Sequence, residues 1–228
     1  MGTEFPSDKI APMRKISFAL GEYYHIYNRG VDKRNIFADF FDINRFFLSM
    51  NEFNTPVSIG SIYEHRFDKP DNSVPKPKLI EFTAYCLNPN HFHFIVTPQH
   101  DAGIQKFMHK LGLGYTNYFN ERHKRSGSLF QGKYKAVHVN SNEYLLHLSA
   151  YVNLNDEVHQ LGNSVPKLVK SSWEEFLDPA TKNPFCRKNI VLDQFATFPA
   201  YKKFAFDCLD SIRLRKKMNM QLEKDLFD

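Results

Sequence analysis

Two histidines that alternate with bulky apolar residues are the strongest sign of chemistry in this chain. His91 and His93 flank Phe92, and Phe94 and Val96 continue the alternation. Because successive side chains of a strand point to opposite faces of a sheet, both imidazoles would lie on one face and the apolar residues on the other. Two imidazoles on a rigid strand can supply two ligands of a divalent metal site. Each histidine alone could equally be an ordinary packed or surface residue, so a third ligand and a reactive group are needed.

A tyrosine and an asparagine further along the chain could supply them. Tyr151 and Asn155 are four residues apart, so on a helix they would share one face. If that face meets the histidines, Mg²⁺ or Mn²⁺ could bind there and keep open positions for phosphate oxygens. A neutral phenol is a weak nucleophile, which bound metal and local positive charge would assist. The alternative is that Tyr151 packs in the core beside Leu148 and Val152.

Strands and turns that position these residues follow from hydrophobic alternation. The predicted strands are 16–27, 79–87, 91–97 and 134–139. Asn88, Pro89 and Asn90 suit a tight turn, so the second and third strands should form a hairpin. Residues 54–78 contain four prolines and are interpreted as a long insertion loop, with a short strand near 58–63.

Helices follow from apolar residues three and four apart. The clearest stripe runs from Ile104 to Phe119, over more than four turns. Asp42 could cap an earlier helix, and Asn140 or Ser141 could cap one that continues through Val152. Residues 202–226 resemble a terminal amphipathic helix. This order of elements predicts an α+β fold, an antiparallel sheet of four to five strands with helices packed on one face and the other face available for a ligand.

Composition restricts the class of protein. Of the 228 residues, 42% are hydrophobic and 15% aromatic, which is enough for a substantial core. The net charge of +5 is a moderate bias toward polyanions that solubility alone could explain. The three cysteines share no short spacing, which argues against a disulfide framework and fits a reduced cytoplasm. No apolar run approaches the roughly 20 residues of a membrane-spanning helix.

Three blocks of sequence resemble single-tyrosine HUH transposases in their order and approximate spacing. The blocks are 90–93, 127–135 and 151–155, and the resemblance spans about 16–158. It is closest to the branch associated with repetitive extragenic palindromes. It implies a ferredoxin-like HUH endonuclease fold with a catalytic domain at 16–160, including the 54–78 insertion. A tail at 1–15 and a C-terminal extension at 161–228 complete the predicted domains.

The resemblance implies a transposase that binds single-stranded hairpin DNA, cleaves it through a 5′-phosphotyrosyl intermediate and rejoins strands. It implies that Tyr151 is the nucleophile and that His91, His93 and Asn155 bind a divalent metal, Mg²⁺ or Mn²⁺. No nucleotide cofactor is needed, because the covalent link keeps the bond energy. We expect a bacterial, cytoplasmic and nucleoid-associated protein. A homodimer is one assembly that relatives use. Many relatives carry Pro where this chain has Asp156.

Basic and aromatic residues around the second block form the predicted DNA-binding surface. Cations neutralise phosphates, and aromatic rings stack on unpaired bases. A run of charges could also be a solvated turn. The predicted residues are Arg29, Arg122, Lys124, Arg125, Phe130, Lys133, Tyr134 and Lys135.

Other functions remain open on the sequence. A replication initiator or relaxase-type nickase uses the same metal and tyrosine chemistry on another substrate. A non-catalytic nucleic-acid-binding α+β domain would not need Tyr151 at all. A metal hydrolase with a water nucleophile would form no covalent adduct.

Overall fold

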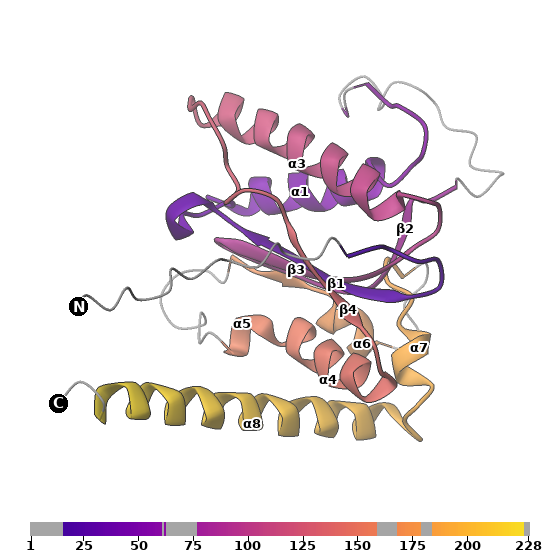
Figure 1. Cartoon of the computed structure of the whole chain (residues 1–228), viewed down its shortest axis with the longest axis vertical. Coiled ribbons are helices and arrows are strands. Elements are labelled where there is room, and N and C mark those ends of the chain that lie inside the picture. Colours follow the sequence, from indigo (N-terminus) through magenta and orange to yellow (C-terminus); the bar gives the residue numbers. More distant parts are fainter. Residues whose placement is uncertain (1–15, 61, 63–76, 159–167, 179–183, 226–228) are drawn as a thin grey trace, which may run out of the picture.

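The computed structural model describes residues 16–60, 62, 77–158, 168–178 and 184–225, with side chains as far as residue 218. Its centre is a five-stranded antiparallel sheet in the order β4-β1-β3-β2-β5 (Figure 1). The predicted α+β class and antiparallel sheet are therefore confirmed. The strands are β1 (Tyr23–Arg29), β2 (Ile80–Asn88), β3 (His91–Pro98), β4 (Lys135–Val139) and β5 (Lys170–Ser171).

Helices of very different length surround the sheet. They are the 3-10 turn η1 (Val31–Lys33), α1 (Phe40–Glu52), α3 (Gly103–Arg122), α4 (Asn142–Asn153), α5 (Asn155–Val158), α6 (Trp173–Leu177), α7 (Asn189–Leu192) and α8 (Phe198–Asp225). No helix of the described residues is both long enough and apolar enough to cross a membrane.

The predicted hairpin forms the middle of the sheet. β2 and β3 pair antiparallel across a turn at Pro89 and Asn90, with Asn88 opposite His91. β3 is the central strand, flanked by β1 and β2. A central strand presents both faces to the protein interior, so its side chains are buried on both sides.

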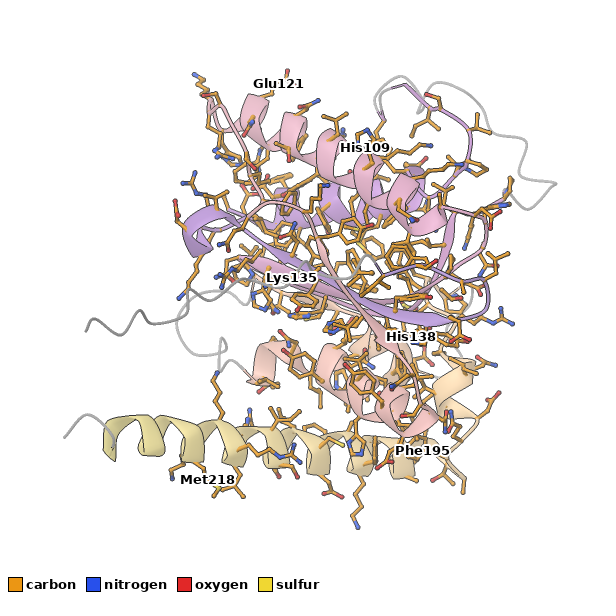
Figure 2. All side chains as sticks on the ribbon, viewed as in Figure 1. His109, Glu121, Lys135, His138, Phe195 and Met218 are labelled. Atoms are coloured by element: carbon orange, nitrogen blue, oxygen red, sulfur yellow. The ribbon has the colours of Figure 1, made fainter. Side chains whose placement is uncertain are left out.

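Helices cover both faces of this sheet, whereas the sequence predicted one. α1 and α3 lie on one face, and α4 to α8 lie on the other (Figure 1). In Figure 2, His109 on α3 and Met218 on α8 mark the two layers, with Lys135 on the sheet between them. The prediction failed because the apolar residues of the second layer come partly from short C-terminal elements with weak periodicity.

The C-terminal extension is joined to the sheet and to α4 by specific bonds. β5 adds a strand to β2. The Tyr201 hydroxyl of α8 accepts a hydrogen bond from Asn153 Nδ2 at 3.0 Å and lies 3.2 Å from Ser149 Oγ. Ser172 Oγ donates to Asn153 Oδ1 at 2.6 Å. The predicted terminal helix is confirmed, although it begins earlier than predicted, and it fixes α4 from behind.

Several predicted boundaries shift. β1 begins at Tyr23, and residues 16–22 form no strand. Residues 58–60 form no strand either, and positions 61 and 63 of that prediction lie outside the described residues. The helix predicted from Asp42 begins at Phe40, because the Asp39 side chain accepts a hydrogen bond from Asp42 N and acts as the cap. Ser141 caps α4 as predicted, by accepting from Tyr144 N at 3.1 Å.

Candidate active site

The predicted nucleophile and the predicted metal ligands meet within one chain. β3 presents His91 and His93 to the face that α4 covers, and their ring centroids lie 5.2 Å apart at 87°. The Tyr151 ring of α4 lies 5.5 Å from the His93 ring, edge to face at 81°. Tyr151 is half-buried and is not sealed away from the imidazoles. The arrangement on which the sequence prediction depended is therefore present.

Asn155 reaches the same site from a different helix. α4 ends at Asn153, Leu154 leaves the helical conformation, and Asn155 begins α5. Tyr151 and Asn155 therefore do not share one continuous helix, contrary to the prediction. The amide is fully buried and its Oδ1 lies 3.0 Å from His91 Nε2. Burial raises the pKa of the Tyr151 phenol, and the neighbouring Asn155 side chain opposes part of that rise.

Asn90 orients the His91 ring, which sequence reasoning missed. Asn90 Nδ2 donates to the Lys33 carbonyl at 3.1 Å, so its Oδ1 faces His91. His91 Nδ1 lies 2.6 Å from that oxygen and must be the donor. In neutral His91 the Nε2 lone pair then points toward Asn155. Metal-binding histidines commonly have their second nitrogen held by such an acceptor.

Asn88 is a second site residue that the sequence did not indicate, because the sequence predicted it only as part of the turn. Its Nδ2 lies 2.9 Å from His91 Nε2 and 2.7 Å from Asn155 Oδ1. Both partners are acceptors, so their lone pairs converge on the Asn88 amide. The only sequence signal was its position at the end of the strand that precedes the histidines.

His25 completes the site from β1. Its Nε2 shares a hydrogen bond of 2.9 Å with His93 Nδ1, and a metal ion would therefore bind His93 through Nε2. Burial lowers the pKa of His25 to about 4, so the ring is neutral near pH 7. Sequence reasoning placed His25 in a strand but had no reason to pair it with His93.

The donor set fits a divalent cation with mixed nitrogen and oxygen ligands. Two neighbouring ligands of an octahedral Mg²⁺ lie roughly 3 Å apart, and His91 Nε2 and Asn155 Oδ1 are separated by 3.0 Å. Among the described residues, no group of three or more His, Cys, Asp and Glu is placed to hold a metal. A metal site here would thus require the Asn155 amide as the third ligand.

The histidines open into a cavity of about 560 Å³ with a positive lining. Its cationic side chains are Arg29, Lys33 and Lys135, and no carboxylate is among its lining residues. Tyr151 lines a neighbouring groove of about 700 Å³ between α4 and α8, together with His25. Tyr151 thus lines the groove, and its ring contacts His93, which lines the cationic cavity.

The predicted DNA-binding residues divide into two groups. Arg29 and Lys135 line the cationic cavity, and the Arg29 guanidinium hydrogen-bonds the Gln131 amide. Lys133 and Tyr134 lie on the same segment, 128–135, which crosses the edge of the sheet (Figure 1). Phe130 is buried with its ring edge to face against Phe92, and so it is no exposed stacking surface. Phe130, Lys133 and Tyr134 line a different pocket from Arg29 and Lys135.

The other three predicted residues lie at the far end of α3. Arg122 is ion-paired to Asp39 at 2.6 Å and to Asp42 at 2.5 Å, and the pair lowers the pKa of Asp39 to about 2. Arg125 donates to Asn120 and to the Ser128 carbonyl, which holds the turn in place. Lys124 is exposed. The structure does not bring this group into the cationic cavity.

Residues 62–155 match the family model described as "Transposase IS200 like". The matched segment contains the histidine strand, α3 and α4, and it ends at Asn155. This segment of the chain is therefore similar to IS200-like transposases, in agreement with the resemblance of the sequence blocks. The similarity supports DNA transposition as the broad function.

One solved structure is similar in fold and is described as "Structure of the REP associates tyrosine transposase bound to a REP hairpin". The TM-score is 0.48 at 11% sequence identity, over 77% of this chain and 96% of that chain. A likeness of this strength carries no argument about function. No curated protein matches the sequence.

Proposed function

We propose that this chain cleaves single-stranded DNA through a covalent bond to Tyr151 and then rejoins strands, as a transposase does. The observation that carries the proposal is the contact between the Tyr151 and His93 rings, 5.5 Å apart within a single chain. Because both parts of the site come from one chain, its assembly does not require a dimer. A homodimer remains a prediction.

Cleavage would proceed by in-line displacement at phosphorus. The raised pKa keeps the Tyr151 phenol protonated near neutral pH, and the proton passes to water as the phenol oxygen attacks. A bond forms between that oxygen and the phosphorus, and the bond to the DNA 3′-oxygen breaks. The 3′-oxygen takes up a proton and leaves as a 3′-hydroxyl. The 5′-phosphate remains linked to the tyrosine.

Rejoining would reverse these events with a different strand. A DNA 3′-hydroxyl attacks the phosphotyrosine, and the tyrosine oxygen leaves and regains its proton. One phosphorus–oxygen bond forms for each that breaks, so no nucleotide cofactor is consumed. A single tyrosine suffices, since the same residue is regenerated for the next cleavage.

The residues around Tyr151 would bind and orient the phosphate. His91, His93 and Asn155 would hold Mg²⁺ or Mn²⁺, which supplies Lewis acidity to the scissile phosphate when bound. Asn90 and His25 hold the two imidazoles in fixed orientations. Cations that line the cavity, Arg29, Lys33 and Lys135, would neutralise the neighbouring phosphates of the strand.

A denaturing gel tests the proposal directly. The protein is mixed with Mn²⁺ and a panel of single-stranded hairpin DNAs, and a covalent protein–DNA band is sought. We expect the band with the wild type and with Tyr144→Phe, a half-buried tyrosine on the same helix, and its loss in Tyr151→Phe. A band that persists in Tyr151→Phe would overturn the proposal, as would no band with the wild type on any hairpin.

The same reaction separates a transposase from a nickase that acts at a replication or transfer origin. A second DNA with a free 3′-hydroxyl is added to the covalent complex. Transfer to element ends that carry the hairpin supports transposition. Transfer only at an origin sequence supports the replication initiator or relaxase instead.

A further inference from the structure

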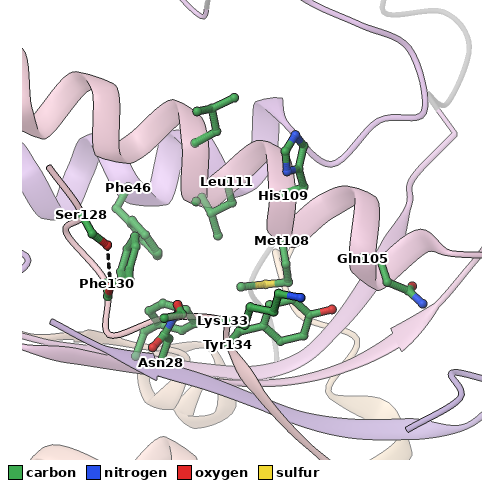
Figure 3. A pocket seen from close by; sticks show the side chains of 14 residues that line it. Asn28, Phe46, Gln105, Met108, His109, Leu111, Ser128, Phe130, Lys133 and Tyr134 are labelled. Atoms are coloured by element: carbon green, nitrogen blue, oxygen red, sulfur yellow. Dashed lines mark hydrogen bonds between the residues drawn. The ribbon is translucent and has the colours of Figure 1, made fainter. Parts of the chain in front are cut away.

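A third pocket lies on the opposite face of the sheet from the candidate active site, the face covered by α3. It has a volume of about 530 Å³ and is enclosed by α3 and the segment 128–134 (Figure 3). Figure 3 shows Met108 pointing from α3 toward Tyr134, with Phe130 to the left, below Ser128. The mechanism proposed above uses none of this space.

The lining of this pocket suits a flat, uncharged, partly polar ring. Its walls are mainly apolar and aromatic, and a few amide and hydroxyl groups, such as Gln105 and Ser128, lie among them. Pockets of this composition and size bind small organic groups. Lys133 is exposed at the pocket, and no carboxylate is among the lining residues. An anionic chain that carries flat rings therefore matches the pocket in both charge and shape.

The pocket and the cationic cavity lie on opposite faces of the sheet and share lining at its edge. Asn28 lines both spaces, and the segment after Phe130 contributes to them in turn. Lys133 and Tyr134 line the pocket, whereas Gln131 and Lys135 line the cavity. A strand whose phosphates lie in the cavity would reach the pocket by passing around this edge, along residues 131–135.

The shared wall is held firmly to β1. Gln131 N donates to the Arg29 carbonyl at 2.8 Å, and Asn28 Nδ2 donates to the Gly132 carbonyl at 3.2 Å. Ser128 Oγ donates to the Phe130 carbonyl at 2.7 Å, as the dashed line in Figure 3 marks. A preformed pocket of this kind does not have to be assembled by its ligand.

We propose that this pocket binds one unpaired nucleobase of the DNA strand whose backbone occupies the cationic cavity. The base would stack against Tyr134 with its edge among the polar groups, and Lys133 would face its phosphate. This proposal rests on the DNA-binding part of the proposed function. It adds a contact that would select the sequence beside the cleavage site.

Gly112 offers a way to fill the pocket without disturbing the fold. It lies on α3 one turn after Met108 and lines the pocket, and a Cβ placed there meets no atom within 4 Å. Leu is also a better helix former than Gly, so Gly112→Leu should fold at least as well. Gly112→Ala, which leaves most of the space open, and Asn117→Leu, on an exposed part of α3 outside the pocket, are the matched controls.

The experiment uses a DNA hairpin with a single-stranded arm that carries 2-aminopurine at one position at a time. With the wild type, the fluorescence of at least one position should change on binding. Gly112→Leu should remove that change and weaken binding about tenfold, in line with the stacking energy of one base, while both controls behave as the wild type. Lys133→Ala, a change at an exposed residue, should also weaken binding.

Two results would overturn the pocket proposal. One is that Gly112→Leu binds the hairpin as tightly as the wild type with the same fluorescence change. The other is that no position of the arm responds. The covalent band of Tyr151 is measured in the same samples, so its absence would count against the tyrosine chemistry separately, whatever the fluorescence shows.

Discussion

The two faces of the sheet are stabilised in different ways. On the α1 and α3 face, aromatic rings fill the core: Phe46 lies 4.7 Å from Tyr115, 5.5 Å from Phe92 and 6.4 Å from Phe94. The α4 and α8 face also has an apolar core, which includes Leu148, Val152 and Phe176. Beside it, buried polar groups pair with one another, as His25 does with His93. Apolar packing is roughly proportional to buried area, whereas each buried polar group needs a specific partner. Both faces contribute apolar packing, and the second also holds the paired polar groups of the candidate site. We therefore expect changes on the first face to affect stability and changes on the second to affect chemistry as well.

The largest expected effect is on chemistry, from a change on the polar face. His93→Ala removes one of the proposed metal ligands and the imidazole against Tyr151, so covalent adduct formation should fall by several orders of magnitude and Mn²⁺ binding should be lost. Isothermal titration with Mn²⁺ and the denaturing gel measure the two effects. His138→Ala, at an exposed histidine on β4 paired with Glu22, is the control and should leave both unchanged. Wild-type Mn²⁺ affinity in His93→Ala would contradict the assignment.

On the aromatic face the largest effect should be on stability. Phe46 is fully buried, so Phe46→Ala should lower the free energy of unfolding by about 3–5 kcal/mol. Urea denaturation measures this, and the folded fraction should still form the Tyr151 adduct. Phe41→Ala, at a ring that is 74% exposed on the same helix, should cost less than about 0.5 kcal/mol. Equal costs for the two changes would show that this face does not form the core.

Acid should weaken the polar face selectively. The folded pKa of His25 is lowered to about 4 from an ordinary value of 6.5, so the unfolded chain binds more protons between these values. Its contribution is therefore complete above about pH 6.5 and is lost as the pH falls toward 4. Burial lowers the pKa of His91 in the same direction. The free energy of unfolding should drop by about 2 kcal/mol from His25 between pH 7 and 5.

Urea midpoints across this pH range provide the measurement for the acid effect. His25→Phe keeps a ring of similar size without a titrating group, so its stability should depend less on pH than that of the wild type. An unchanged pH dependence in His25→Phe would show that another group is responsible.

The smallest expected effect concerns the bonds that hold α4 from behind. Tyr201→Phe removes the hydroxyl that accepts from Asn153 and contacts Ser149 but keeps the ring. The variant should be less stable by about 1 kcal/mol, since two buried polar groups each lose a partner. Thermal unfolding would show this as a small fall in Tm. An unaltered Tm would mean that Asn153 and Ser149 find other partners.

Sequence alone determined the elements whose signals are local. The alternation from His91 to Val96 predicts a strand because successive side chains of a strand point to opposite faces. The apolar stripe from Ile104 to Phe119 predicts a helix because its spacing matches the helical period. Ser141 caps α4 because a side-chain oxygen there can reach Tyr144 N. The pairing of Tyr151 with the two histidines also followed from sequence, through the resemblance to a family. Each of these depends on neighbours in the chain or on a recurrent motif.

Tertiary structure decided what depends on residues far apart in the chain. From the sequence, either Asp39 or Asp42 could cap α1. In the structure Asp39 is the cap, and Asp42 is buried within the helix, where Arg122 and His123 pair with its carboxylate. The pairing of His25 with His93 spans 68 positions, so no local pattern could indicate it. The pocket under α3 forms only because the 128–134 segment lies against that helix. These hydrogen bonds and cavities form between segments that are distant in the sequence and close in space. Local sequence patterns do not indicate which distant segments will be in contact.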